Sequence, residues 1–251
     1  MELILAWQNT GTRKWHPVAR IGRDDHGYWL RYTSGVLSPE AGATARLVGM
    51  DDIYVEYRSR ELFPFLQNRV FNRSRADFER YRRWIGLAES DVNDPLVELA
   101  ASGGPRATDP FQLYRVPEPD DGRYIMPFFV HGVSHTAGFD EPIRRIEDGE
   151  RLFLQLDIQN PHDDEAISLR TSDPKLLLGH VPRILTTDFQ RLVELNGADA
   201  VGVYLSAVNN DGPTSVRYRC YLETHWPTNF RPFQDPEFEA IPFRATLGVV
   251  A

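Results

Sequence analysis

Carboxylates gather in one polar segment of the chain, and they are the first residues to test for chemistry. Asp157 precedes a predicted turn, and residues 163–165 (Asp-Asp-Glu) follow it. Such a group could hold a divalent metal ion in a nuclease, because hard cations prefer oxygen ligands. Metal-dependent nucleases usually add a Glu-x-Lys on a neighbouring strand, and the two lysines, Lys14 and Lys175, do not lie in that context. We therefore expect solvated turn carboxylates here.

Other catalytic and metal-binding patterns are missing from the sequence. It contains no GxxxxGK[ST], GxGxxG or GxSxG motif. His131 and His135 are four residues apart, but they flank Gly132 in strand-like sequence, whereas an i,i+4 ligand pair needs a helix. The sequence thus predicts a protein that is not an enzyme, with no catalytic residues, no metal and no cofactor.

Composition indicates an ordinary globular chain. The 251 residues are 41% hydrophobic and 25% charged, which suits one large domain or two small ones. Cys220 is the single cysteine and lies in alternating strand sequence, so we expect a buried apolar role for it and a reducing, cytoplasmic location. The apolar run 3–7 is too short for a signal peptide, and no run approaches about 20 apolar residues, so no membrane association is expected.

The charge is unevenly distributed. Residues 1–124 carry a net charge of −1 and residues 125–251 carry −7. An acidic half argues against non-specific binding of duplex nucleic acid, which depends on neutralising many phosphates. A local exception is the segment from Arg58 to Arg83, which holds eight arginines against three acidic residues. Its candidate residues for a phosphate or an acidic partner are Arg73, Arg75, Arg80 and Arg83. The alternative is a solvated helix face.

Short strands and two helices are expected in the first half. Strand patterns cover residues 3–7, 18–21 and 28–32. Ser74 is placed to cap a helix that ends at Gly86. Asp94 is placed to cap a second helix over residues 95–101, with Gly103-Gly104 at its end.

The second half reads as β-rich. Residues 117–124 form the best linker of the chain, since they are rich in Pro, Asp and Gly. Beyond it, strand patterns lie near 125–131, 151–158, 165–171, 176–181, 200–208 and 216–225, with one helix at about 184–195. This organisation predicts an α+β protein: a small N-terminal sheet with helices over residues 1–116, and a small barrel-like sheet with one or two helices and a C-terminal tail over residues 125–251.

Several motifs of the second half occur in order. Gly132 follows an apolar run, Asn160-Pro161-His162-Asp163 forms a turn motif, and the segment Gly179–Arg183 follows as Gly-His-Val-Pro-Arg. A glycine before His-Val-Pro-Arg lets the backbone come close to another group. On these motifs, residues 125–230 resemble the HIRAN domain, a small β-rich nucleic-acid-binding module that stands alone in some bacterial proteins and is fused to helicase-type enzymes in others.

The resemblance implies a binding pocket. In the family, the segment after the opening glycine, the Asn-Pro-x-Asp turn and the Gly-x-x-Pro-Arg segment hold the 3′ end of a single strand. The residues that fit this pattern here are His135, Asn160, Asp163, His180 and Arg183. Asp163 would accept a bond from a terminal hydroxyl, and His180 and Arg183 would contact phosphate. The segment Val133–Thr136 departs from the family, which often has basic and aromatic residues there. Plain turn chemistry at Asn160 and Asp163 is the alternative.

The first half has a resemblance of its own. Residues 59–69, which include Phe63-Pro64-Phe65, and the helix end Leu99–Gly104 are similar to the N-terminal subdomain of HipA-type kinases over residues 1–115. The kinase catalytic motifs are absent. Two functions follow. The leading one is a nucleic-acid-binding accessory protein for single-stranded DNA or strand ends, in repair, restart or defence. The alternative is an antitoxin-like module that binds a kinase or another protein through residues 58–104.

Overall fold

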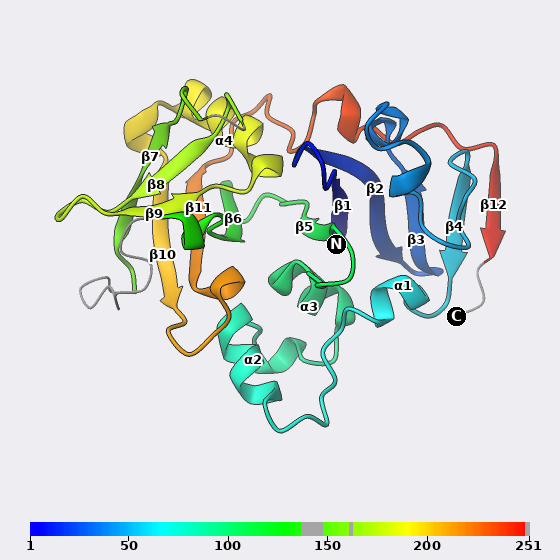
Figure 1. Ribbon diagram of the computed structural model, residues 1–251. Helices are drawn as coiled ribbons and strands as arrows, with labels where there is room; N and C mark the ends of the chain where they lie inside the picture. Colours follow the sequence, from blue (N-terminus) through cyan, green and yellow to red (C-terminus); the bar gives the residue numbers. More distant parts are fainter. Residues whose placement is uncertain (137–147, 161–162, 249–251) are drawn as a thin grey trace. The chain divides into compact units, whose positions relative to one another are not determined.

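The computed structural model describes residues 1–136, 148–160 and 163–248. Contacts divide the chain into two units. The first consists of residues 1–78 and 87–116 together with the chain from Phe233 onward, and the second of residues 79–86 and 117–232. Each unit contains one six-stranded sheet (Figure 1).

The sheet of the first unit has the order β12-β4-β3-β2-β1-β5. Its strands are β1 (Glu2–Gln8), β2 (Trp15–Asp24), β3 (Gly27–Tyr32), β4 (Val55–Ser59), β5 (Phe111–Arg115) and β12 (Ala245–Gly248). Neighbours are antiparallel except for the parallel pair β12–β4. Residues 3–6 of β1 are all fully buried, which explains why this strand reads as a continuous apolar run.

Two short helices complete the core of the first unit. They are α1 (Pro64–Gln67) and α3 (Pro95–Ser102), and Leu66, Leu96 and Leu99 are fully buried in the same apolar cluster as the sheet. The predicted limits of the second helix are confirmed. Asp94 Oδ1 accepts hydrogen bonds from the backbone N–H of Leu96 (3.0 Å) and Val97 (3.4 Å), and Gly103 ends the helix in the left-handed conformation.

Helix α2 (Phe78–Ile85) begins later than the sequence predicts. Ser74 is not its cap, because the backbone N–H and the hydroxyl of Ser74 donate to Asn72 Oδ1 at 2.9 and 2.8 Å. The local Asx turn at Asn72 therefore replaces the expected first turn of helix. The C-terminal limit is as predicted, since Gly86 follows at φ +68.

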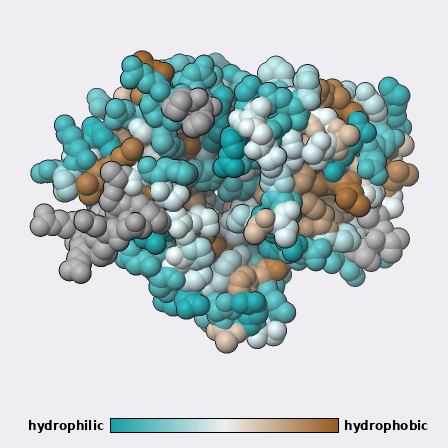
Figure 2. Space-filling view, in the orientation of Figure 1, coloured by the Kyte–Doolittle hydropathy of each residue, from teal (hydrophilic) through white to brown (hydrophobic). Residues whose placement is uncertain are grey.

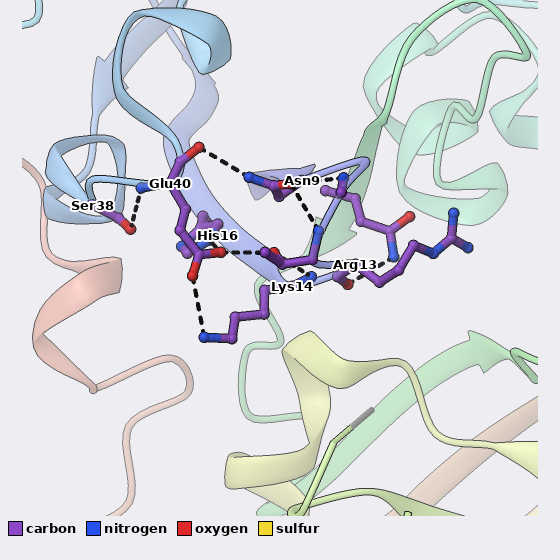
Figure 3. A network of polar contacts seen from close by, with 9 residues as sticks. Asn9, Arg13, Lys14, His16, Ser38 and Glu40 are labelled. Atoms are coloured by element: carbon purple, nitrogen blue, oxygen red, sulfur yellow. Dashed lines mark hydrogen bonds and ion pairs between the residues drawn. The ribbon is translucent and has the colours of Figure 1, made fainter. Parts of the chain in front are cut away.

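A polar network fixes the hairpin between β1 and β2 (Figure 3). Asn9 Oδ1 accepts from the backbone N–H of Thr12 at 3.0 Å. The Glu40 carboxylate accepts a hydrogen bond from the Thr12 hydroxyl (2.7 Å). It also lies 3.2 Å from Lys14 Nζ and 3.5 Å from His16 Nε2. These contacts, with the Thr12 hydroxyl the largest, lower the pKa of Glu40. A single carboxylate thus ties the hairpin to the loop that follows β3.

The sheet of the second unit has the order β6-β11-β10-β7-β8-β9, and its neighbours are antiparallel. Its strands are β6 (Arg123–Phe129), β7 (Arg151–Leu156), β8 (Ile167–Arg170), β9 (Leu177–His180), β10 (Gly202–Val208) and β11 (Tyr218–His225). Helix α4 (Arg183–Asn196) packs on the inner face, where the Phe128 and Phe189 rings are 5.5 Å apart. All six predicted strands and the predicted helix are confirmed, and Cys220 is fully buried as expected.

Two segments group differently from the predicted boundaries. The sequence analysis placed everything after residue 125 in the second domain, but β12 pairs with β4, and Phe238 and Ile241 are buried at 4% and 6% exposure in the first unit. Residues 79–86 group with the second unit, where Trp84 Nε1 donates to Asp211 Oδ1 at 2.8 Å. Both contacts join residues far apart in sequence, so local patterns do not indicate them.

The face in Figure 2 is mainly hydrophilic, and its hydrophobic residues lie in separate patches. In the described part of the chain, no helix is both long enough and apolar enough to cross a membrane.

Candidate nucleic-acid interface

The sheet of the second unit curls until its two edges meet at one point. Residue His131, just beyond β6, forms an antiparallel bridge with His180 at the end of β9. The backbone N–H of each histidine donates to the carbonyl oxygen of the other, at 2.9 and 2.8 Å. We call this point the seam. It brings the opening-glycine segment and the Gly-His-Val-Pro-Arg segment side by side.

Gly179 makes the seam possible. Its φ is +141, and a Cβ at this position would lie 2.3 Å from the His131 carbonyl oxygen. Any side chain would therefore prevent the two edges from meeting. The sequence-based expectation of a close backbone approach at this glycine is confirmed, and the group approached is the His131 carbonyl.

A hydrogen-bonded polar cluster lies beside the seam. Asn160 Nδ2 donates to Asp157 Oδ2 at 3.0 Å, and His180 Nε2 lies 3.3 Å from the same oxygen. The backbone N–H of Asn160 also donates to the Asp157 carbonyl at 3.0 Å. The hydrogen bond from Asn160, followed by that from His180, lowers the pKa of Asp157. The structure thus brings two predicted residues, Asn160 and His180, together around one ionised carboxylate.

Asp157 is the residue of this cluster that sequence reasoning missed as a binding residue. The sequence analysis considered it only as a metal ligand. Strand register places it there: Phe153, Gln155 and Asp157 are two residues apart and face the same side as His180. A single sequence does not specify that register. Within the described residues, no group of three or more His, Cys, Asp or Glu side chains is arranged to hold a metal ion.

Asp163 and Arg183 form a second polar group. Arg183 Nε lies 3.2 Å from Asp163 Oδ1, and the guanidinium also contacts Glu165 and donates to Thr186 Oγ1 at 2.6 Å. Asp163 Oδ1 accepts from the backbone N–H of Glu165 at 3.1 Å, as expected of a turn residue. Arg183 is the first residue of α4. Turn chemistry and ion pairing therefore account for part of what these two residues do. Residues 161–162 of the motif lie outside the described residues.

The segment after Gly132 forms a short 3₁₀ turn over Val133–His135. Gly132 has a φ of +69, and a Cβ there would come within 3.4 Å of His180 Nδ1, so this glycine lies against the His180 ring. His135 is exposed, and its backbone N–H donates to the Gly132 carbonyl at 2.9 Å. His131 is half-buried, and desolvation, with the nearby His180, lowers its pKa to about 4. The His131 imidazole that borders the cluster is therefore neutral near pH 7.

The four arginines of the Arg58–Arg83 segment are not equivalent. Arg73 donates to the Val92 carbonyl and lies 3.3 Å from buried Glu98, and Arg75 pairs with Asp77 at 2.9 Å. These two belong to the first unit. Arg80 and Arg83 belong to the second unit, and the Arg80 guanidinium lies 5.1 Å from the Trp84 ring centre. Internal contacts therefore use much of the cluster, and its role as a partner surface stays a prediction.

A cavity of about 450 Å³ lies elsewhere in the second unit, between β7 and α4. Its walls are mainly apolar and include Leu152, Leu154, Phe189 and Val193. None of the predicted binding residues lines it. The polar cluster at the seam is therefore a surface site and not part of this cavity.

A curled antiparallel sheet with one inner helix and a polar seam defines the class of the second unit: a small β-rich module. Residues 126–227 match the family model of the HIRAN domain. This match confirms the HIRAN resemblance for that part of the chain, whereas the resemblance of the first half to HipA-type kinases finds no support and stays a prediction. No curated protein matches the chain.

Two solved structures were also found. One is a protein from Lactobacillus plantarum, with 15% identity over 41% of this chain and 100% of the other, at a TM-score of 0.31. The second is the HIRAN domain of human HLTF, with 14% identity over 49% of this chain and 99% of the other, at a TM-score of 0.33. The assignment rests on the family match and not on these weak structural likenesses.

Proposed function

We propose that the second unit binds single-stranded nucleic acid at its 3′ end, at the seam, and that the protein is a non-enzymatic accessory factor. The observation that supports this most directly is the cluster of Asp157, Asn160 and His180. Three segments that the HIRAN family uses for binding come together there, although the sequence separates them by up to about fifty residues.

The chemistry of the cluster suits a strand end. Asp157 and Asp163 are hydrogen-bond acceptors for a terminal hydroxyl, and His180, Arg183 and the exposed His135 offer donors or a ring to phosphate and base. A carboxylate repels the negative charge of an internal phosphate but accepts a hydrogen bond from a terminal hydroxyl. It therefore favours the end of a nucleic-acid strand over its interior.

Charge supports the same selectivity. Because residues 125–251 carry a net charge of −7, long-range attraction to duplex is weak. Affinity must then come from short-range contacts to one end of a strand. We expect single strands with a free 3′ hydroxyl to bind better than blunt duplex at physiological salt.

A binding titration tests the proposal. Single strands, duplexes and forks are compared, each with a free 3′ hydroxyl and with a 3′-phosphate block. The expected result is tightest binding to free 3′ ends and a clear loss on blocking. Tight duplex binding that ignores the ends and falls steeply with salt would contradict the proposal.

A substitution within the cluster provides a second test of the proposed function. Asn160→Ala removes the donor that orients Asp157, and we expect weaker binding to free 3′ ends. Asn196→Ala is the matched control, because Asn196 is also bonded within the second unit, to Thr224 (2.9 Å) and to the His225 carbonyl (2.7 Å), but lies at the far end of α4. Equal effects of both changes would mean that only folding is affected.

A further inference from the structure

The outer face of the second sheet carries aromatic and arginine side chains in a row. Burial alternates along β11, so that Cys220 and Leu222 point inward and Tyr221 points outward. Tyr221 is paired with Tyr204 on β10, and Tyr204 with Arg151 on β7. Phe153 follows two residues after Arg151 on the same face.

Direct contacts join these side chains into two groups, and the strand pairing of Tyr204 with Arg151 places the groups side by side. The Tyr204 and Tyr221 rings are stacked, with centres 5.4 Å apart. The Arg151 guanidinium lies 5.8 Å from the Phe153 ring centre. Arg170, on β8, is paired with Phe153 of β7, and its guanidinium lies 4.9 Å from the same ring centre. We call this set the aromatic–arginine stripe: Arg151, Phe153, Arg170, Tyr204 and Tyr221.

The backbone makes room for the stripe. A Cβ at Gly202 would lie 2.5 Å from the Tyr204 ring, so the ring lies directly over this glycine. The rings of Phe153, Tyr204 and Tyr221 are all half-buried, and Arg151 is exposed. Half-buried rings keep part of their surface in solvent, where a further ring is able to stack.

The arginines of the stripe are not neutralised. Arg123, Arg183 and Arg75 are ion-paired, but within the described residues neither Arg151 nor Arg170 forms an ion pair. Among the residues that the structure describes, Arg170 donates only to the neighbouring Thr171 carbonyl, at 3.1 Å. In a unit with net negative charge, cations left beside half-buried aromatic rings contribute little to folding and remain available to an anion.

The stripe and the seam share one face of the sheet. The strand register pairs Gln155 with Ser168, and Ser168 with His180, so this face of the sheet continues from β7 across the buried Ser168 of β8 to the polar cluster. Strands are about 4.8 Å apart, so the step from β7 to β9 is roughly 10 Å. A bound nucleic-acid strand whose 3′ end lies at the seam would reach the stripe within its next few nucleotides.

We propose that the aromatic–arginine stripe is a second binding surface, on which bases of a single strand stack while Arg151 and Arg170 contact its phosphates. This inference rests on the proposed function, because it follows the strand away from the 3′ end. Aromatic stacking combined with guanidinium groups is how proteins hold single strands without reading their sequence. The stripe therefore adds affinity for longer strands, whatever their bases.

The experiment measures the affinity for two oligothymidylates that both have a free 3′ hydroxyl. One is a dinucleotide, and the other has about ten nucleotides, which is within the usual site size of surfaces that bind single strands. Tyr204→Leu with Tyr221→Leu keeps apolar bulk but removes the stacking rings. We expect this variant to bind the longer strand about tenfold or more weakly, and the dinucleotide as the wild type does. Tyr54→Leu, an exposed tyrosine of the first unit, is the control.

Arg151→Gln with Arg170→Gln tests the phosphate contacts and serves if the tyrosine variant fails to fold. Loss of two contacts should flatten the salt dependence for the longer strand by about 1.4 in the log–log slope. Arg231→Gln, an exposed arginine outside the sheet, should leave the slope unchanged.

The outcomes separate the two proposals. If the wild type binds neither oligonucleotide, the proposed function fails and the stripe proposal fails with it. If the wild type binds free 3′ ends and the stripe variants bind the longer strand equally well, only the stripe proposal is overturned. If the stripe variants lose as much affinity for the dinucleotide as for the longer strand, the substituted residues act on binding at the seam, and the stripe proposal is again overturned.

Discussion

Asp163 and Arg183 have a structural contact in the second unit, and the proposed function adds a binding role; magnitudes separate the two. The pair Asp163–Arg183 is partly exposed, with side chains 23% and 36% accessible. An ion pair of this kind contributes about 0–1 kcal/mol to stability. A charge-assisted hydrogen bond to nucleic acid is worth about 1.5–3 kcal/mol. The effect on binding should therefore exceed the effect on folding.

We expect Asp163→Ala and Arg183→Ala each to weaken binding to a free 3′ end by about tenfold or more, with little change in melting temperature. Binding titrations and thermal unfolding on the same samples check this. Asp163→Ala protein that melts much earlier, yet binds normally while folded, would show that the residue serves only its turn.

His131 should make the stability of the second unit depend on pH. Desolvation lowers its pKa from 6.5 to about 4, so the folded state keeps the imidazole neutral. In the unfolded chain the ring is protonated below about pH 6.5. The stabilising contribution is thus fully present above pH 6.5 and is lost as the pH falls from there towards 4.

Denaturant unfolding at about pH 7 and about pH 5 measures this dependence. His131→Leu stays neutral at both values and keeps the backbone bridge to His180, so its stability should change less with pH than that of the wild type. His26→Leu, at an exposed hairpin histidine, is the control and should leave the dependence unchanged. The hypothesis fails if His131→Leu and the wild type lose the same stability.

At the scale of elements, the seam closes the sheet and depends on one glycine. Gly179→Ala would place a Cβ 2.3 Å from the His131 carbonyl and would also hold alanine at a φ of +141. Gly149→Ala is the matched control, because Gly149 also has a positive φ, +87, but a Cβ there meets nothing within 4 Å. We expect the control to cost about 1–2 kcal/mol of unfolding free energy and Gly179→Ala clearly more. Similar costs would show that the edges do not need to meet.

The elements of the second unit were predictable because their signals are local. Each of its strands alternates buried and exposed residues or forms a short apolar run, and α4 lies between two such patterns. The Asp94 cap and the Gly103 stop of α3 are equally local. The predicted cap at Ser74 is wrong because the Ser74 backbone N–H donates to the side chain of Asn72, two residues earlier.

Features that depend on distant contacts were not predictable. The strand β12 has four exposed residues and no pattern of its own, and it is a strand only because β4 is beside it. The site shows the same limit. Asn160 and His180 were found through the family motif, but their common partner Asp157 and the stripe of Tyr204 and Tyr221 follow from strand register, which a single sequence does not specify.

At the scale of the whole molecule, the chain returns to its first unit after completing the second. The returning segment is held by the backbone N–H of Ile241, which donates to the Tyr32 carbonyl at 2.8 Å, and by Arg20 Nε, which donates to the Phe238 carbonyl at 2.8 Å. Phe238 is 4% exposed and Ile241 6%. The stability of the N-terminal sheet therefore depends on residues at the opposite end of the sequence.

Phe238→Ala with Ile241→Ala tests this dependence in the full-length chain. Truncating a buried large apolar side chain to alanine costs about 2–5 kcal/mol, so the double change removes much of the 5–15 kcal/mol that typically stabilises a domain. Hydrogen exchange should show β2 and β3 losing protection while β10 and β11 keep theirs. Phe243→Ala, at a residue 43% exposed, should leave all four strands protected. Loss of protection in β10 and β11 instead would place the segment after Phe233 with the second unit, as the sequence alone had indicated.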